Sequence, residues 1–196
     1  MTRIELARKC IITEEVKEAA AAEGVSAEAL SADIASGVSV IPLNRNRRIK
    51  PIAIGRGLRT KINANIGTSK DRVSIEEEME KLNALVKYGA DAVMDLSTGG
   101  PIKELRAMML RKSPIAIGTV PIYEAAVRAA EEKGAISRMT ADDLFRVIEE
   151  HASSGVDFVT VHCGLTMKAV DRLRAEGRIL DIVSRGGVVP VGMDDL

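Results

Sequence analysis

The pattern of apolar and polar positions along the chain changes near residue 60. Before that point, two stretches rich in alanine and acidic residues, 13–24 and 26–37, each begin at a Ser or Thr and end at a glycine. Ser and Thr favour the N-cap of a helix and glycine favours its end, so these stretches predict two short helices. Extended chain is expected at Ser39–Pro42 and Pro51–Gly55. Residues 1–59 are therefore expected to form a helical and extended N-terminal arm.

From residue 60 onward, short apolar runs alternate with longer amphipathic stretches. Apolar residues near a 3.6-residue period predict helices, and the apolar runs between them predict buried strands. Such an alternation is typical of a parallel sheet covered by helices. The expected helices cover 74–87, 123–133, 140–154 and 167–176, and a further helix is expected to begin at Pro101. The expected strands are Lys61–Gly67, Asp91–Ser97, Ser113–Val120, Asp157–His162 and Leu180–Ser184.

Two architectures fit this alternation. A doubly wound sheet would carry a glycine-rich phosphate turn directly after its first strand, whereas Gly55 and Gly57 precede that strand here. A (β/α)8 barrel of the TIM type places polar residues at the C-terminal end of strand after strand. We therefore predict an α/β fold in which residues 60–196 supply about the first five strands of an incomplete barrel. The polar strand ends are Asn63 and Asn65, Asp95 and Ser97, Thr119, His162, and Ser184 and Arg185.

The first strand carries two amides that share a face. Asn63 and Asn65 are two residues apart, so their side chains point the same way. A buried amide at a strand end needs a partner, and either a ligand or the backbone of a neighbouring loop would serve. Lys61 lies on the same face, where a lysine could in principle form a Schiff base.

Two glycine-rich strand ends are suited to anions. Asp95 is followed by Leu-Ser-Thr-Gly-Gly, which offers small donors and adaptable backbone, although a plain strand-to-helix turn has the same composition. Ser184, Arg185 and Gly186 combine a hydroxyl group, a guanidinium group and a backbone that a ligand can approach closely. Because the guanidinium fork pairs with phosphate oxygens, we expect a phosphate there. An arginine that caps a helix or forms a salt bridge is the alternative.

Single residues add further candidates. His162 ends the fourth expected strand and could be a base, a hydrogen-bond donor or a metal ligand; no second ligand lies near it in sequence, so no metal site is predicted. Tyr123, in the loop after the third strand, offers a hydroxyl group, whereas Met94 is typical of core packing. We expect His151 at the surface of its helix. The basic loop 44–50 is expected to be a solvated turn rather than a phosphate site.

The amino-acid composition argues against several functional classes for this protein. The 28 Lys and Arg residues balance 28 Asp and Glu residues, which argues against electrostatic binding of nucleic acid or anionic membranes. Aromatic residues are 2% of the chain, too few for base-stacking platforms. The two cysteines, Cys10 and Cys163, form no Cys-x-x-Cys motif and no disulfide framework. With no apolar run of about 18 residues and a charged N-terminus, we expect a reduced, soluble, cytoplasmic protein.

Ordered segments over nearly all of residues 2–187 carry a family resemblance. They are Ala7-Arg8 with Ile11-Ile12-Thr13, Thr60–Ser69, Val93–Gly100, Ser113-Pro114 with Gly118–Tyr123, Val161-His162 and Ile182–Gly187. By these segments the chain resembles the phosphomethylpyrimidine synthases of thiamine biosynthesis. The resemblance implies a (β/α)8 barrel that rearranges aminoimidazole ribonucleotide into 4-amino-5-hydroxymethyl-2-methylpyrimidine phosphate. It also implies a [4Fe-4S] cluster, S-adenosylmethionine and zinc as cofactors of a radical lyase reaction.

Position by position, the resemblance assigns substrate contacts but no catalytic residue. It agrees with the phosphate expected from the residue types at Ser184 and Arg185. The implied substrate-contacting residues are Asn65, Met94, Tyr123, His162, Ser184, Arg185 and Gly186.

The chain also departs from the family pattern. An Asp-Gly-x-Arg stretch, an acidic residue, two metal-binding histidines and a three-cysteine motif have no counterpart, and Val188–Gly192 would break the helix that the family has there. We therefore expect a portion of the enzyme, inactive alone, whose cofactor ligands lie outside this chain. A small-molecule substrate and self-association, as a homodimer or otherwise, are the expected partners. The alternatives are a half-barrel that acts with another chain and a non-catalytic phosphonucleotide-binding module.

Overall fold

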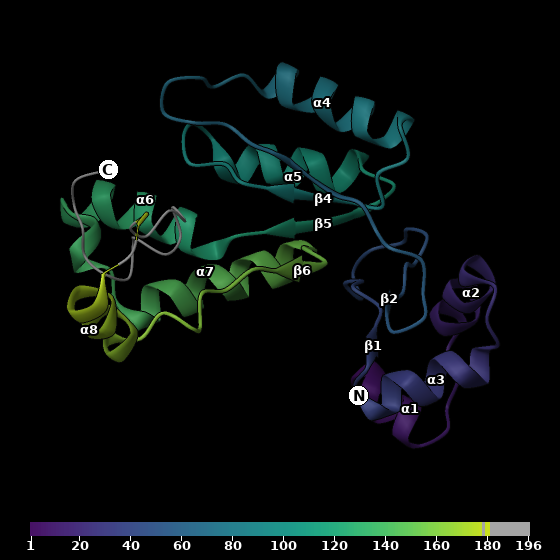
Figure 1. Cartoon of the computed structure of the whole chain (residues 1–196). Helices are drawn as coiled ribbons and strands as arrows, with labels where there is room; N and C mark the ends of the chain where they lie inside the picture. The colour runs from purple at the N-terminus through teal and green to yellow at the C-terminus, as the bar shows by residue number, and fades with distance from the viewer. Residues whose placement is uncertain (178, 181–196) are drawn as a thin grey trace.

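The structure, a computed structural model, describes residues 1–177 and 179–180. Its N-terminal part contains three helices and a two-stranded antiparallel sheet (Figure 1). The two helices expected from sequence are confirmed, and α1 is additional; its six residues are too few to show a period, but a Thr-Glu capping box begins it. The elements are α1 (Arg3–Arg8), α2 (Glu14–Glu23), α3 (Ala27–Ser36), β1 (Ser39–Val40) and β2 (Ile54–Gly55).

The remaining elements alternate strand and helix, as predicted. Four parallel strands pair in chain order, β3-β4-β5-β6. The strands are β3 (Asn63–Ile66), β4 (Ala92–Asp95), β5 (Ala116–Thr119) and β6 (Phe158–Val159). The helices are α4 (Ile75–Lys87), α5 (Ile102–Lys112), α6 (Pro121–Lys133), α7 (Ala141–Ser154) and α8 (Met167–Glu176), with a 3₁₀ turn η1 (Ile136–Arg138) between α6 and α7.

The strands are shorter than the apolar runs that predicted them. The last expected strand, Leu180–Ser184, lies outside the described residues except for Leu180. The described sheet is therefore a parallel four-stranded one, which is compatible with part of a barrel. Pro101 occupies the N-cap of α5 instead of its first helical position.

An aliphatic core lies between this sheet and α4 and α5. Val93 and Ile117, from the two central strands, are fully buried, and the helices contribute Leu82, Leu105 and Met109. Met79 and Leu82 of α4 are three residues apart, and Leu105 and Met109 of α5 are four apart, so each pair lies on one stripe of its helix. Within the described part of the chain, no helix has the length and the apolar character needed to cross a membrane.

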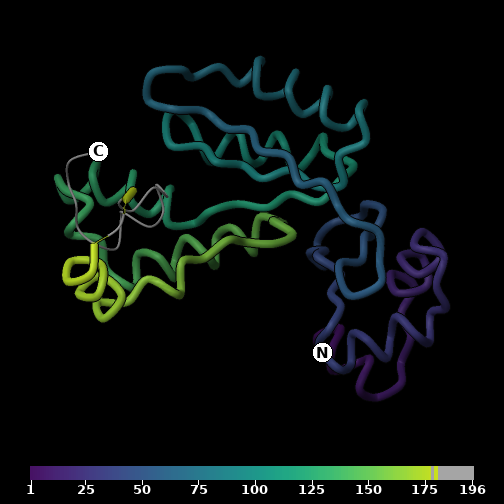
Figure 2. Tube along the Cα trace, viewed as in Figure 1, coloured from purple at the N-terminus to yellow at the C-terminus, as the bar shows by residue number. Residues whose placement is uncertain are grey.

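The N-terminal arm lies beside the N-terminal ends of the strands (Figure 2). Arg47 is 7% exposed; one of its guanidinium nitrogens lies 3.6 Å from Asp157, and another donates to the Ser113 carbonyl at 2.8 Å. The backbone N–H of Asn44 donates to the same aspartate at 2.9 Å. The prediction of a solvated basic turn at 44–50 is therefore wrong at Arg47, because a guanidinium that finds an aspartate and carbonyl oxygens can be buried.

Candidate functional site

Four residues lie side by side across the parallel sheet. Asn65 is in register with Met94, Met94 with Gly118, and Gly118 with Phe158. Residues in register on parallel strands share a face, and this face is opposite to the one that α4 and α5 cover. We call these four residues the central row. On β3, β4 and β5 it lies one residue before the C-terminal end of the strand, where ligands bind in parallel α/β folds.

Gly118 leaves room in the central row for the ring of Phe158. A Cβ atom on Gly118 would lie 2.3 Å from Cε2 of Phe158, so only a glycine allows the ring to occupy this position. Phe158 also packs against the apolar cluster of Met94, Val120 and Ile122. Sequence reasoning did not select Phe158 as a site residue. The signal available was its rarity, since the chain has only two phenylalanines.

The amides of β3 are exposed. Asn63 and Asn65 lie on the same face, as predicted, but neither is buried. The expectation of a buried amide is therefore wrong for the described residues, because no other element covers the end of the central row at β3. An exposed amide keeps both its donor and acceptor groups available to a ligand.

Met94 and Tyr123 belong to the same apolar cluster at this face. Met94 is buried with Val120 and Ile122, and Tyr123 packs against that cluster. Tyr123 lies in the first turn of α6 and not in a loop, because Pro121 starts this helix immediately after β5. A half-buried phenol in the first helical turn is still open to a ligand at the C-terminal edge of the sheet.

Of the four remaining predicted substrate contacts, the structure describes only His162. His162 is half-buried in the connection that follows β6 and leads to α8, so it belongs to the C-terminal edge of the sheet. Ser184, Arg185 and Gly186 lie outside the described residues. The structure thus brings together Asn65, Met94 and Tyr123 and adds Phe158.

Other polar strand ends point away from this face. Asp95 and Thr119 are in register with each other and are buried on the side of the helices. Burial raises the pKa of Asp95, although hydrogen bonds from the side chain and the backbone N–H of Ser97 oppose this. Asp95 and Ser97 belong to the turn between β4 and α5, where both side chains are buried. The loop after β4 is joined to the loop after β3 by the hydroxyl of Thr68, which donates to the Gly99 carbonyl at 2.6 Å.

Lys61 lies at the N-terminal end of β3 and not at the site. Its ammonium group is 2.7 Å from a carboxylate oxygen of Glu23, and both side chains are buried. Burial alone would raise the pKa of Glu23, but the hydrogen bond and charge of Lys61 lower it on balance. This ion pair fastens the N-terminal arm to the sheet and gives Lys61 no place in Schiff-base chemistry here.

The expectation that His151 lies at the surface of its helix is wrong, because this residue is 2% exposed. It accompanies Arg106 and Glu124 in a buried polar cluster. Acidic neighbours in sequence suggested an exposed position, whereas its spacing of four residues from the buried Val147 indicated the apolar stripe of α7. The period of the helix was the better signal.

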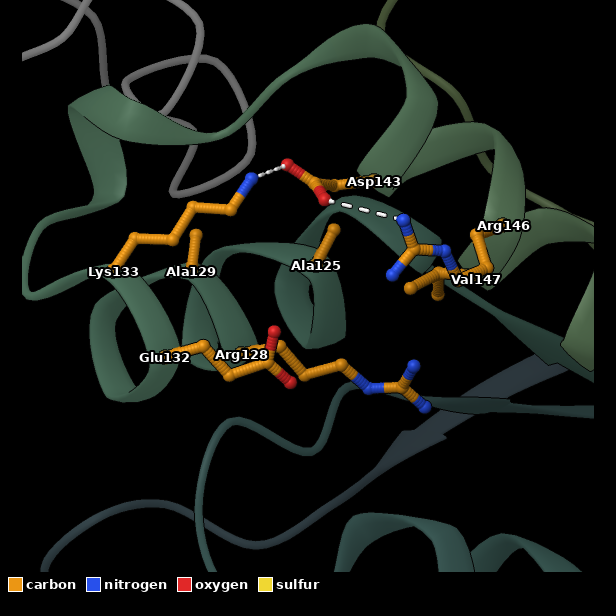
Figure 3. A pocket seen from close by; sticks show the side chains of 8 residues that line it. All are labelled: Ala125, Arg128, Ala129, Glu132, Lys133, Asp143, Arg146 and Val147. Carbon is orange, nitrogen blue, oxygen red and sulfur yellow. Dashed lines mark hydrogen bonds and ion pairs between the residues drawn. The ribbon is translucent and has the colours of Figure 1, made fainter.

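A hollow between α6 and α7 lies apart from the central row (Figure 3). Its cationic groups are paired with acidic neighbours: Lys133 binds Asp143, and a guanidinium nitrogen of Arg146 lies 3.8 Å from the same residue. Arg128 pairs with Glu150 at 2.6 Å. The hollow therefore offers little uncompensated charge to an anion.

Comparison with known proteins decides the family. The profile of the radical SAM ThiC family matches residues 2–193. The chain belongs to the radical SAM ThiC family. It is 64% identical over 189 residues to the phosphomethylpyrimidine synthase of Thermodesulfovibrio yellowstonii, covering 96% of this chain and 44% of that protein. It is 56% identical to the phosphomethylpyrimidine synthase of Moorella thermoacetica and 51% identical to that of Geobacter metallireducens, covering 95% and 97% of this chain and 44% of each relative.

The cofactors that this family name implies are a cluster and S-adenosylmethionine, and the residues present do not fit the cluster. An iron–sulfur cluster is held by cysteine thiolates, and this chain has two cysteines, Cys10 and Cys163, both exposed. Among the residues that the structure describes, no group of three or more His, Cys, Asp or Glu side chains is placed to hold a metal ion.

Proposed function

We propose that this chain is a portion of a phosphomethylpyrimidine synthase in thiamine biosynthesis. The complete enzyme would convert aminoimidazole ribonucleotide to the hydroxymethylpyrimidine phosphate by S-adenosylmethionine radical chemistry. Membership of the radical SAM ThiC family supports this proposal. The chain spans about 44% of the length of the curated relatives that it matches, so the activity is proposed for the whole enzyme and not for these residues alone.

The observation that carries the proposal is the central row. The resemblance implies substrate contacts at Asn65 and Met94, and these residues are in register on adjacent strands. Tyr123, a third implied contact, packs against the Met94 cluster. The implied contacts therefore lie close to one another near the C-terminal edge of the sheet, where a single ligand could contact them.

We also propose that the four described strands are the first strands of a (β/α)8 barrel. The parallel order β3-β4-β5-β6 with helical crossovers supports this arrangement. In it, the face of the central row would line the interior near the mouth. The next strand expected from sequence is Leu180–Ser184, and the implied contacts Ser184, Arg185 and Gly186 lie outside the described residues.

Each residue then has a role in binding and orienting the substrate. The amide of Asn65 would donate to and accept from polar groups of the aminoimidazole ring. Met94, Tyr123 and Phe158 would present an adaptable apolar and aromatic surface to the ring. Arg185 would pair with the phosphate, and His162 would supply a hydrogen bond at the same edge. The cluster, S-adenosylmethionine and zinc would be held by residues outside this chain.

Substitution at Asn65 tests the proposal in a complete enzyme, assembled from this chain and the remaining portion of the 64% identical relative. Loss of a hydrogen bond to a neutral group costs about 1 kcal/mol, so Asn65→Ala should weaken binding of aminoimidazole ribonucleotide about fivefold. Asn63→Ala is the matched control, since Asn63 shares the face but lies one row nearer the N-terminal ends. Equal effects of the two variants, or no product from the assembled enzyme, would contradict the proposal.

Arg185→Ala tests the phosphate site in the same enzyme. A charge-assisted pair contributes about 1.5–3 kcal/mol, so affinity for the nucleotide should fall roughly tenfold to a hundredfold. Binding of the dephosphorylated nucleoside should stay nearly unchanged, because the arginine would contact only the phosphate. A variant that keeps the full preference for the nucleotide would show that Arg185 is structural.

A further inference from the structure

A buried network of polar side chains joins the end of β5 to three helices. Arg106 of α5 is ion-paired with Glu124 in the first turn of α6. Oε2 of Glu124 is 2.7 Å from Nε2 of His151, in the last turn of α7. Nδ1 of His151 is 2.8 Å from the hydroxyl oxygen of Thr119, the last residue of β5. All four residues are at most 5% exposed, so water barely reaches them.

Glu124 is a shared partner in this network. Burial alone would raise the pKa of Glu124, but the hydrogen bond with His151 and the charge of Arg106 lower it to about 2. An ionised carboxylate only accepts, so Arg106 donates to Glu124. Nε2 of His151 also lies 2.8 Å from a guanidinium nitrogen of Arg106, so its role as donor or acceptor depends on the tautomer of the ring. In either tautomer, the side chains of the network lie within hydrogen-bond distance of one another.

Stability alone is a weak explanation for this network. Desolvation of buried charges costs as much as, or more than, their attraction returns, and well-packed apolar side chains commonly serve as well. The same contact between sheet and helices is made by aliphatic residues beside α4 and α5. Hydrogen-bonded charged groups add a defined geometry, because they hold side chains and backbone at one angle and one distance.

Tyr123 lies in the segment that the network holds in place, the first turn of α6. Glu124 is its neighbour in the chain, so the two side chains leave the first turn of α6 in different directions. Glu124 points to Arg106 and His151, whereas Tyr123 packs against the cluster that contains Met94. A shift of this turn would move the phenol relative to the central row.

We propose that Arg106, Glu124 and His151 are positioning residues that fix Tyr123 for contact with the substrate. The role of Tyr123 as a substrate contact rests on the proposed function, whereas the effect of the network on the orientation of Tyr123 does not. None of the three residues is among the substrate contacts that the family resemblance implies. They act through the first turn of α6, from the side of the sheet opposite to the ligand.

The chain itself provides a reporter for this proposal. It has no tryptophan and two tyrosines, and Tyr88 is 81% exposed. A Tyr88→Phe background therefore leaves Tyr123 as the sole strong fluorophore. In that background, Glu124→Gln keeps the shape of the side chain but removes the charge. Because the turn loses its anchor, we expect acrylamide quenching of Tyr123 to increase about twofold and its near-ultraviolet circular dichroism to weaken.

Two further variants keep the test decisive. Thr119→Val retains every charge and removes one hydrogen bond to His151, so it reports on orientation if Glu124→Gln does not fold. Asp157→Asn is the matched control, since it weakens another buried ion pair, with Arg47, at the opposite end of the strands. Asp157→Asn should lower the urea midpoint without changing the signal of Tyr123.

The outcomes separate the two proposals. Unchanged quenching in both network variants, or an equal change in Asp157→Asn, would overturn the positioning role. Added aminoimidazole ribonucleotide tests the proposed function separately: it should protect Tyr123 from quenching in the Tyr88→Phe chain and protect it less in Glu124→Gln. Failure to protect the Tyr88→Phe chain would count against the substrate contact, while the effect of the network variants on Tyr123 would still stand.

Discussion

Glu124 shows how strongly a single residue depends on its surroundings in this protein. Arg106 approaches it from α5, His151 from α7, and Arg128 from the next turn of its own helix. Burial opposes ionisation, yet His151 and Arg106 more than offset it and the pKa of Glu124 falls to about 2 from an ordinary value of 4.5. The folded state therefore binds the proton of Glu124 less readily than the unfolded chain does.

This pKa shift predicts a pH-dependent contribution to stability. A lowered pKa stabilises the folded state above pH 4.5, and the contribution declines as the pH falls through the folded-state pKa of about 2. At about 1.4 kcal/mol per pKa unit, the contribution is about 3 kcal/mol. The difference in free energy of unfolding between wild type and Glu124→Gln, measured with urea, should shrink by this amount between neutral pH and pH ~2. A difference that is independent of pH would contradict the ionised network.

At the scale of elements, the loops after β3 and β4 fit together through glycine. A Cβ atom on Gly99 would lie 2.6 Å from the carbonyl oxygen of Ser69 and 2.7 Å from the backbone nitrogen of Lys70. Backbone cannot move aside as a flexible side chain can. The approach of these loops therefore depends on the absence of a side chain at Gly99.

Gly99→Ala should separate the two loops. Overpacking of this kind costs about 1–3 kcal/mol, which should appear as a lower urea midpoint. Gly164→Ala is the control, because nothing lies within 4 Å of its Cβ position; it should change stability by less than about 1 kcal/mol. Similar midpoints for the two variants would contradict the close loop contact.

At the scale of the whole molecule, the parallel sheet has two edge strands among the described residues. β3 and β6 each pair on one side only. Apolar side chains near these edges are exposed, including Ile62 at 58% and Val161 at 45%. Exposed strand edges and apolar faces pair readily with other chains.

We therefore predict that the purified chain associates with itself, as a dimer or a larger assembly. Light scattering coupled to gel filtration measures the mass directly, and mass should rise with protein concentration. Lysine substitution at Ile62 should weaken association, because a charge on the edge opposes strand pairing. A monomer that unfolds in one cooperative transition at all concentrations would contradict this prediction.

The cysteine content of the whole chain limits the cofactors that it can hold. With cysteines only at positions 10 and 163, anaerobic reconstitution with iron and sulfide should leave no stoichiometric cluster on this chain, because three grouped thiolates are lacking. The complete enzyme assembled with the relative's remaining portion is the positive control. About four irons for each copy of this chain alone would overturn the expectation.

Local patterns predicted most of the elements correctly. The ends of α2 and α3 at Gly24 and Gly37, the N-cap at Ser74 and the alternation of strand and helix follow from residue types and short-range spacing. The shared face of Asn63 and Asn65 also follows from a two-residue spacing. Such features depend on backbone conformation within a few residues, which the local sequence largely determines.

Burial of the polar residues was decided by tertiary structure. Arg47 and His151 resemble surface residues in sequence, yet each is buried because a distant segment supplies a partner: Asp157 forms an ion pair with Arg47, and Glu124 lies within hydrogen-bond distance of His151. The meeting of Met94 with Phe158 depends on register across three strands and on the space above Gly118. A linear pattern can indicate that a residue is polar or apolar, but the energy of burying it depends on which atoms the fold brings beside it.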